Sequence, residues 1–208
     1  MEGVEVVDVR RGRRRAAARV LTEAFLHDPA WVAVGPRRER DRRRLLRRFF
    51  GVALFEAGHW GGPTWAAARG GTTLGVAVTF AEGEKFPPAW ASALESPLFL
   101  LAGRETSLHG AQVGAAMARA HPRQPHLYLW FLAAHPDHQR RGIGRALMHR
   151  VLDEAARRAL PVYLETATPS NIPYYRSFGF EVTGETVLPS HARMWFMWRP
   201  APDEASHA

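Results

Sequence analysis

The order of apolar and polar residues along the chain predicts strands and helices in alternation. Residues 4–9 alternate apolar with acidic positions, which is typical of a short strand. Apolar residues at helical spacing then predict two amphipathic helices, one over 16–26 and a second through Leu45 that ends near Gly58. The first helix should end before Asp28, because Pro29 disfavours helical conformation in the residue that precedes it.

The middle of the chain predicts a hairpin and then a helical stretch. Gly70 and Gly71 separate 64–68 from 72–80, and apolar residues recur with a period of two at Val76, Val78 and Phe80. A loop is expected over 81–88. Residues 89–119 are helical in composition and form either packed helices or a cover over a substrate site, with expected breaks at Pro97, Gly103 and Gly110.

The second half of the chain predicts a sheet with a parallel pair of strands. Residues 127–134 are almost wholly apolar, which indicates a central strand buried on both faces. A glycine-containing loop, a helix over 145–159 and an apolar strand over 161–166 follow. A short helix over 171–178 with Gly179 as its C-cap precedes strands over 180–182 and 194–198, joined by a connection over 183–193. The strand, helix, strand order predicts an α/β fold.

Composition narrows the class of protein. With 208 residues and no internal linker, the chain fits a single domain, here expected over 4–198 with a short tail over 199–208. The absence of cysteine excludes a disulfide scaffold, a thiolate zinc site and a cysteine nucleophile. No apolar run approaches the ~20 residues of a membrane span, and residues 1–15 lack the apolar core of a signal peptide. We therefore expect a soluble, cytoplasmic protein with no membrane partner.

The net charge of +8 comes almost entirely from arginine, since Lys85 is the only lysine. Two basic runs, over 10–15 and 37–48, either bind nucleic acid or form solvated helix faces. Glu39, Asp41, Leu45 and Leu46 interrupt the second run and give it an amphipathic pattern, which favours a helix face. No nucleic-acid partner is therefore expected.

The strongest local motif lies between the strand over 127–134 and the helix that follows. It combines basic side chains with two glycines: Gln139, Arg140, Arg141, Gly142, Ile143, Gly144 and Arg145. A helix N-terminus offers unpaired N–H groups and partial positive charge, and glycine lets the backbone approach a phosphate closely. The motif therefore predicts a pyrophosphate site.

Two other phosphate motifs fit poorly. A P-loop requires Gly-Lys-Ser/Thr, whereas Arg145 follows Gly144. A dinucleotide fold requires a third small residue, where this chain has Leu147. Glu165 follows the glycine motif by ~20 residues, the sequence separation expected of a ribose-binding acid. The loop over 135–141 is nevertheless too long for a tight strand-to-glycine turn.

The pattern Gln/Arg-x-x-Gly-x-Gly/Ala after a strand resembles the acetyl-CoA signature of the GCN5-related N-acetyltransferase (GNAT) superfamily. Asn171 and the run from Tyr174 to Phe180 resemble the ending of that family's domain. Stretches at 23–29, 136–139, 164–166 and 171–175 further resemble puromycin N-acetyltransferase-like actinobacterial enzymes, although Arg140 and Arg141 replace a commoner Gly-Lys pair. The resemblance implies a mixed central sheet of about six to seven strands flanked by helices, with the parallel pair around the acetyl-CoA site.

The resemblance also implies acetyl-CoA as co-substrate, no metal, and direct attack of an amine on the thioester. The pantetheine arm would pair with Leu132, Ala133 and Ala134, and an N–H of this segment would polarise the thioester carbonyl. The amides of 139–145 would hold the pyrophosphate. Asn171 would contact the pantetheine, serve as a helix N-cap, or do both.

Two residues are candidates for proton transfer. Tyr175 aligns with the family's general acid; the alternative is a core aromatic residue. The strand over 127–134 has no carboxylate to act as base. Glu165 lies within an apolar strand, where an unpaired carboxylate is costly, so it is the candidate base or amine anchor. Alternatives are an ion pair of Glu165 with an arginine, or deprotonation through water. Weaker candidates are Asp28, His126, His135 and His191.

The function expected is N-acetylation of a small-molecule primary amine, such as an antibiotic or aminonucleoside. A non-catalytic acyl-CoA sensor and a basic nucleic-acid-binding protein are the alternatives. The acceptor is not specified, because 81–125 encodes no recognisable amine pocket. Dimers are common in the family, which leaves a homodimer open.

Overall fold

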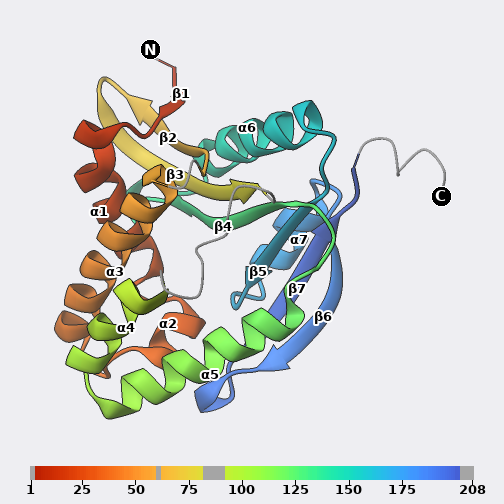
Figure 1. The fold of residues 1–208 in the computed structure, drawn as a ribbon. Coiled ribbons are helices and arrows are strands. Elements are labelled where there is room, and N and C mark those ends of the chain that lie inside the picture. Colours follow the sequence, from red (N-terminus) through yellow and green to blue (C-terminus); the bar gives the residue numbers. More distant parts are fainter. Residues whose placement is uncertain (1–2, 60–61, 82–91, 202–208) are drawn as a thin grey trace.

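The computed structural model describes residues 3–59, 62–81 and 92–201. It contains one seven-stranded sheet in the order β1-β2-β3-β4-β5-β7-β6, with helices on both faces (Figure 1). The strands are β1 (Glu5–Asp8), β2 (Thr64–Arg69), β3 (Thr72–Ala81), β4 (Leu127–Ala134), β5 (Val162–Thr166), β6 (Glu181–Val187) and β7 (Arg193–Arg199). The helices are α1 (Arg14–Phe25), α2 (Pro29–Val34), α3 (Glu39–His59), α4 (Ser92–Leu101), α5 (Arg104–Ala120), α6 (Ile143–Arg157) and α7 (Asn171–Arg176). The predicted mixed α/β fold is confirmed.

The parallel pair of strands is short. β4 pairs with β5 only from Leu127 opposite Val162 to Leu129 opposite Leu164, whereas the other neighbouring strands pair antiparallel. Beyond Leu129, β4 continues along β3, and the end of β5 pairs only with β7. The two central strands therefore diverge toward their carboxyl ends.

The central strands are buried on both faces, as predicted for 127–134. Val76, Val78 and Phe80 of β3 lie in one core cluster, and Leu74 and Ala77 lie in the other. Trp130 is the extra residue of a bulge in β4, since Leu129 and Phe131 face consecutive residues of β3.

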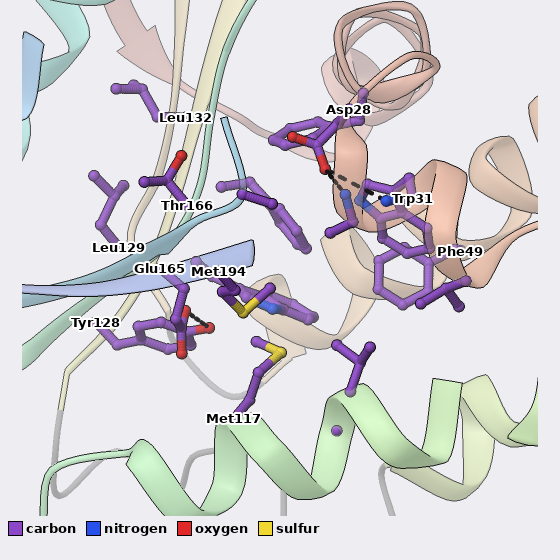
Figure 2. A pocket seen from close by; sticks show the side chains of 18 of the residues that line it. Asp28, Trp31, Phe49, Met117, Tyr128, Leu129, Leu132, Glu165, Thr166 and Met194 are labelled. Carbon is purple, nitrogen blue, oxygen red and sulfur yellow. Dashed lines mark hydrogen bonds between the residues drawn. The ribbon is translucent and has the colours of Figure 1, made fainter. Parts of the chain in front are cut away.

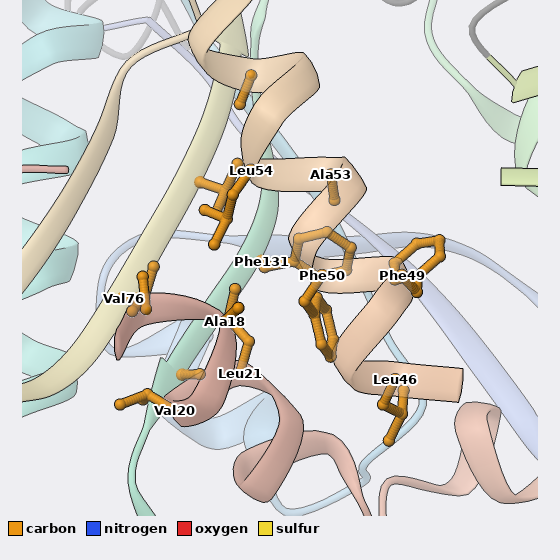
Figure 3. Close-up of a cluster of buried hydrophobic side chains, with 14 of the residues drawn as sticks. Ala18, Val20, Leu21, Leu46, Phe49, Phe50, Ala53, Leu54, Val76 and Phe131 are labelled. Atoms are coloured by element: carbon orange, nitrogen blue, oxygen red, sulfur yellow. The ribbon is translucent and has the colours of Figure 1, made fainter. Parts of the chain in front are cut away.

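Two apolar layers enclose the sheet. α1 and α3 cover one face, and α6 covers the other (Figure 1). Figure 3 shows side chains of α1 and α3 packed against Val76 of β3 and Phe131 of β4. Phe50, fully buried at the centre of this layer, lies 5.1 Å from Phe131 and 5.5 Å from Phe25 between ring centroids.

One helix was not predicted. The first helix ends before Asp28 as expected, but the same dipeptide starts α2. Asp28 Oδ1 accepts hydrogen bonds from the N–H groups of Ala30 (3.0 Å) and Trp31 (3.4 Å), and Pro29 takes the first helical position. Aspartate at the N-cap followed by proline is typical of the beginning of a helix. The prediction treated this dipeptide only as the end of the preceding helix.

Three further predictions about elements were wrong. Pro97 lies inside α4 and Gly110 lies inside α5. Of the three expected breaks, only Gly103, with φ of 116°, falls between these helices. The connection expected over 183–193 contains the second half of β6, an edge strand whose alternate positions are exposed. Its polar sequence hid the period of two. The expected loop over 82–88, residues 89–91 and tail residues 202–208 lie outside the described residues.

Several arginines have partners within the fold. Arg42 is buried and donates to the carbonyls of Leu26 and Pro36, both at 2.9 Å. Arg43 pairs with Glu23 and Glu39. Buried Glu154 pairs with the arginines at positions 150, 157 and 158. Much of the second basic run is thus a helix face, as expected.

Of the described helices, none has the length and apolarity to cross a membrane.

Candidate active site

The glycine motif forms the turn into α6. Gly142 has φ of 81°, a left-handed conformation that favours glycine, and Ile143 is the first helical residue. A Cβ at Gly142 would meet nothing within 4 Å, so a ligand can reach the backbone here. Gln139 through Gly142 are exposed, and the Gln139 side chain donates to the Ala134 carbonyl at 3.4 Å. This geometry suits an anion at the start of α6.

The second glycine of the motif has a different physical role. A Cβ at Gly144 would lie 3.2 Å from the hydroxyl of Tyr174, and the Arg145 guanidinium lies 5.5 Å from the ring centre of Phe178. Gly144 therefore allows α7 to pack beside the start of α6. This contact brings Asn171 and Tyr175, also on α7, to the same region as the turn.

Between the diverging strands, one edge of β4 has no strand partner within the described residues. Leu132, Ala133 and Ala134 pair with β3 on one side only, where they face Ala77, Val76 and Gly75. Their other edge faces the opening toward β5. A peptide-like chain could extend the sheet along this edge.

A cavity of about 400 Å³ opens beside this edge. Figure 2 shows Glu165, Tyr128 and Met194 from the sheet opposite Met117 of α5, with Trp31 of α2 and Asp28, the N-cap of α2, beyond them. Most of the lining is aromatic or aliphatic, with a few polar groups, as in typical small-molecule sites. The predicted residues Leu132, Asn171, Tyr175 and Glu165 all border it.

Glu165 is the carboxylate of β5 that faces this cavity. Its Oε2 accepts a 2.7 Å hydrogen bond from the hydroxyl of Tyr128, and its Oε1 is buried with no hydrogen-bond partner in the described structure. Burial raises the pKa of Glu165 to about 7, although the Tyr128 and Tyr163 hydroxyls lower it. The ion pairs found among the described residues do not include Glu165, so the arginine-pair alternative finds no support.

Tyr175 lies on α7 at the wall of the cavity and is 7% exposed. Burial raises the pKa of its phenol above the ordinary value, and the charges of Tyr174 and Asp28 add to this effect. Tyr175 therefore keeps its proton at neutral pH.

Asp28 also borders the cavity, but its oxygens accept hydrogen bonds from Ala30, Trp31 and, at 3.1 Å, Thr168.

Asn171 is the first residue of α7, and its side-chain nitrogen donates to Thr166 Oγ1 at 3.4 Å. Ser170 takes the N-cap position, so the N-cap alternative for Asn171 is wrong. The side chain lies at the mouth of the strand divergence, since Thr166 ends β5.

The structure adds three polar residues that sequence reasoning missed: Glu56, His121 and Tyr128. Burial and the nearby His126 lower the pKa of His121 to about 4, so this ring is neutral at working pH. Glu56 lies at an apolar position of a helix, and Tyr128 lies at an apolar position of a strand. A polar group at such a position is the sequence feature that could have marked these two residues as candidates. His126, His135 and His191 do not line the cavity. The described part of the chain has no cluster of three acidic or histidine residues suited to a metal ion.

Comparisons with known proteins agree with this geometry. The sequence profile described as the acetyltransferase (GNAT) family matches residues 26–180. A Corynebacterium glutamicum structure described as histone acetyltransferase HPA2 and related acetyltransferase superposes with a TM-score of 0.74 at 22% identity, over 97% of each chain. A polyamine N-acetyltransferase of Drosophila melanogaster superposes with a TM-score of 0.59 at 15% identity, over 94% of this chain and 99% of that one. The structural similarities indicate a shared fold.

Proposed function

This chain belongs to the acetyltransferase (GNAT) family of acetyl-CoA-dependent enzymes, and we propose that its acceptor is the primary amine of a small molecule. The observation that carries this proposal is the position of Glu165. Its carboxylate borders the cavity beside the edge of β4 that has no strand partner among the described residues, so one group can contact an amine where a thioester can lie.

The residues around the strand divergence fit acetyl-CoA. The exposed residues from Gln139 to Gly142 and the open approach at Gly142 suit its pyrophosphate. The free edge at Leu132, Ala133 and Ala134 suits its amide-containing arm, with Asn171 on the opposite side. When bound, acetyl-CoA supplies a thioester carbonyl that a neutral amine attacks to give an amide and a free thiol.

Glu165 suits the role of base. An ammonium group must lose a proton before its nitrogen can attack, and a carboxylate with a pKa of about 7 accepts that proton efficiently near neutral pH. Tyr128 holds the carboxylate in position through Oε2, which leaves Oε1 for the amine. Over the whole reaction the nitrogen loses two protons, one of which ends on the sulfur and the other in solvent.

Tyr175 suits the role of acid. Its phenol stays protonated across the working pH range and lies on the helix that packs against the glycine turn. The hydroxyl can therefore donate a proton to the departing sulfur. Tyr174, whose hydroxyl is buried beside Gly144, is assigned to packing.

The size of the cavity favours a small acceptor. A volume of about 400 Å³ falls within the range of small-molecule sites. The motif resemblance to puromycin N-acetyltransferase-like enzymes adds aminonucleosides to the candidates, and the polyamine enzyme of similar fold adds aliphatic amines.

An amine panel with free-thiol detection tests the proposal. Aminonucleosides, aminoglycosides, polyamines, amino acids and peptide N-termini are each incubated with enzyme and acetyl-CoA. Thiol release that depends on a small amine and falls in Glu165→Gln supports the proposal. Acetyl-CoA binding with no thiol release from any amine would instead support the sensor alternative, and selective turnover of peptides would overturn the small-molecule acceptor.

A further inference from the structure

A second carboxylate borders the cavity away from the sheet. Glu56 lies on α3, is 1% exposed, and its Oε1 has no hydrogen-bond partner among the residues described. Burial raises the pKa of its carboxyl to about 7. Burying a carboxyl oxygen without a hydrogen-bond donor destabilises the fold. A donor group on a bound ligand would offset this cost, so we consider Glu56 as a ligand-binding residue.

Aromatic rings line the same cavity as Glu56. Phe49 is seven residues earlier on α3, which places it on the same helix face about 10 Å along the axis. The ring centroid of Phe49 lies 4.7 Å from Trp31, 6.0 Å from Phe99 and 6.2 Å from Trp130. These rings form an apolar wall that can contact a hydrocarbon or aromatic spacer.

Charge balance in the cavity points to a cationic ligand. The described lining includes Asp28, Glu56 and Glu165 but neither arginine nor lysine. Asp28 uses its oxygens to cap α2 and to bind Thr168, whereas Glu56 and Glu165 each keep one unpaired buried oxygen. The hydroxyls of Tyr128 and Tyr163 face Glu165, whereas no donor among the described residues is found for Glu56 Oε1.

We propose that the acceptor carries a second ammonium group, which Glu56 binds while Glu165 contacts the amine that reacts. The acceptor class is a diamine whose two nitrogens are separated by an apolar spacer that packs on the aromatic wall. This inference rests on the proposed function, because it names the substrate class of the same site. Glu56 acts in specificity: it contacts the acceptor away from the reacting nitrogen.

A matched pair of probes tests the inference on the full chain. 1,4-Bis(aminomethyl)benzene and 4-methylbenzylamine share a ring and a reacting aminomethyl group, and differ in the second amine. The wild-type enzyme should show a KM about 10- to 100-fold lower for the diamine, with similar kcat, as expected for a hydrogen-bonded charge pair. Glu56→Gln should abolish this preference by raising the KM for the diamine to about the value that the same variant shows for the monoamine.

Glu185→Gln is the control, since Glu185 is an exposed residue of β6 paired with Arg193. It should keep the wild-type preference. Equal KM values for the two probes in the wild-type enzyme would overturn the inference and leave the proposed function intact, and this comparison needs no variant.

Calorimetry with the same probes separates the two proposals. If no amine is acetylated, the proposed function fails, and direct binding then decides the role of Glu56. Tighter binding of the diamine that is lost in Glu56→Gln supports the second-ammonium site. Equal binding of both probes refutes it.

Discussion

The hydroxyl of Tyr128 donates a 2.7 Å hydrogen bond to Glu165 Oε2 across the two central strands, at the point where their pairing ends. The last paired residues are Leu129 and Leu164, so Glu165 is the first residue of β5 beyond the parallel ladder. The bond therefore fixes a carboxylate at the apex of the divergence.

Tyr128→Phe should move the acidic limb of the kcat/KM profile to higher pH. The hydrogen bond from Tyr128 favours the ionised carboxylate and lowers the pKa of Glu165, so its removal raises that pKa further. The rate should fall most below pH 7 and recover in alkaline buffer. Tyr174→Phe, the same change at a residue outside the cavity lining, should leave that limb in place. If the acidic limb of Tyr128→Phe does not shift, titration of Glu165 does not control the pH dependence of kcat/KM.

Glu165→Gln keeps the shape of the side chain and removes its ability to accept a proton. If Glu165 is the base, kcat/KM should fall by about 10²–10⁴-fold, most strongly at low pH where the acceptor is an ammonium ion. If Glu165 only anchors the amine, KM should rise more than kcat falls. Steady-state kinetics from pH 6 to 9 distinguish the two, and unchanged kinetics throughout would leave deprotonation to water.

Glu56→Gln should stabilise the protein at alkaline pH. The folded pKa of Glu56 is raised from 4.5 to about 7, so its contribution to stability is present below pH 4.5 and is lost as the pH rises through 7. Glutamine does not titrate and avoids this loss, which is worth at most about 3 kcal/mol. Melting temperatures of variant and wild type should agree at pH 4.5, and the variant should melt higher at pH 8. A constant difference across this range would show that Glu56 does not titrate in the fold.

Tyr175→Phe removes a proton donor and retains the ring. General acid catalysis contributes about 10²–10⁴-fold, so kcat should fall within that range while the affinity for acetyl-CoA stays close to wild type. Stopped-flow kinetics and calorimetry measure the two quantities. Wild-type kcat in the variant would assign Tyr175 to the core, where its 7% exposure also fits.

Gly142→Glu should abolish acetyl-CoA binding, because the new carboxylate would occupy the open approach to the helix and repel the pyrophosphate. Gly71→Glu is a matched control. Gly71 has a similar φ of 78° and, like Gly142, has nothing within 4 Å of a built Cβ, but it lies in the β2–β3 turn. Both variants bear the backbone strain of a left-handed residue, and only Gly142→Glu should lose calorimetric binding. Equal affinities in the two variants would contradict the anion site.

The sequence predicted the frame of the fold because its signals are local. The hairpin followed from Gly70 and Gly71, both with positive φ, and the central strand followed from the apolar run over 127–134. α2 and the second half of β6 were missed for a physical reason. A cap dipeptide can end one helix and begin the next, and an edge strand exposed at alternate positions needs few apolar residues.

The sequence predicted the part of the candidate site that lies in one continuous segment. It missed residues that the fold brings together from distant segments. Gly142 is recognisable from the order of residues alone. The cavity joins α2, α3, α5, β4 and β5, and the partner of Glu165 is 37 residues away on another strand. Glu56 gave one signal, an acid among the apolar positions of α3, which residue types alone cannot separate from a surface acid.

The three-residue pairing of β4 with β5 makes the sheet a union of two antiparallel leaves, β1 to β4 and β5 to β7. The first leaf supplies Leu132, Ala133 and Ala134, whereas the second leaf and α7 supply Glu165 and Tyr175. Because neither leaf holds all residues of the candidate site, a ligand that contacts both leaves would bridge the seam between β4 and β5. Ligand occupancy and the joining of the leaves are therefore thermodynamically linked, and amide hydrogen exchange along the seam should slow when the site is filled.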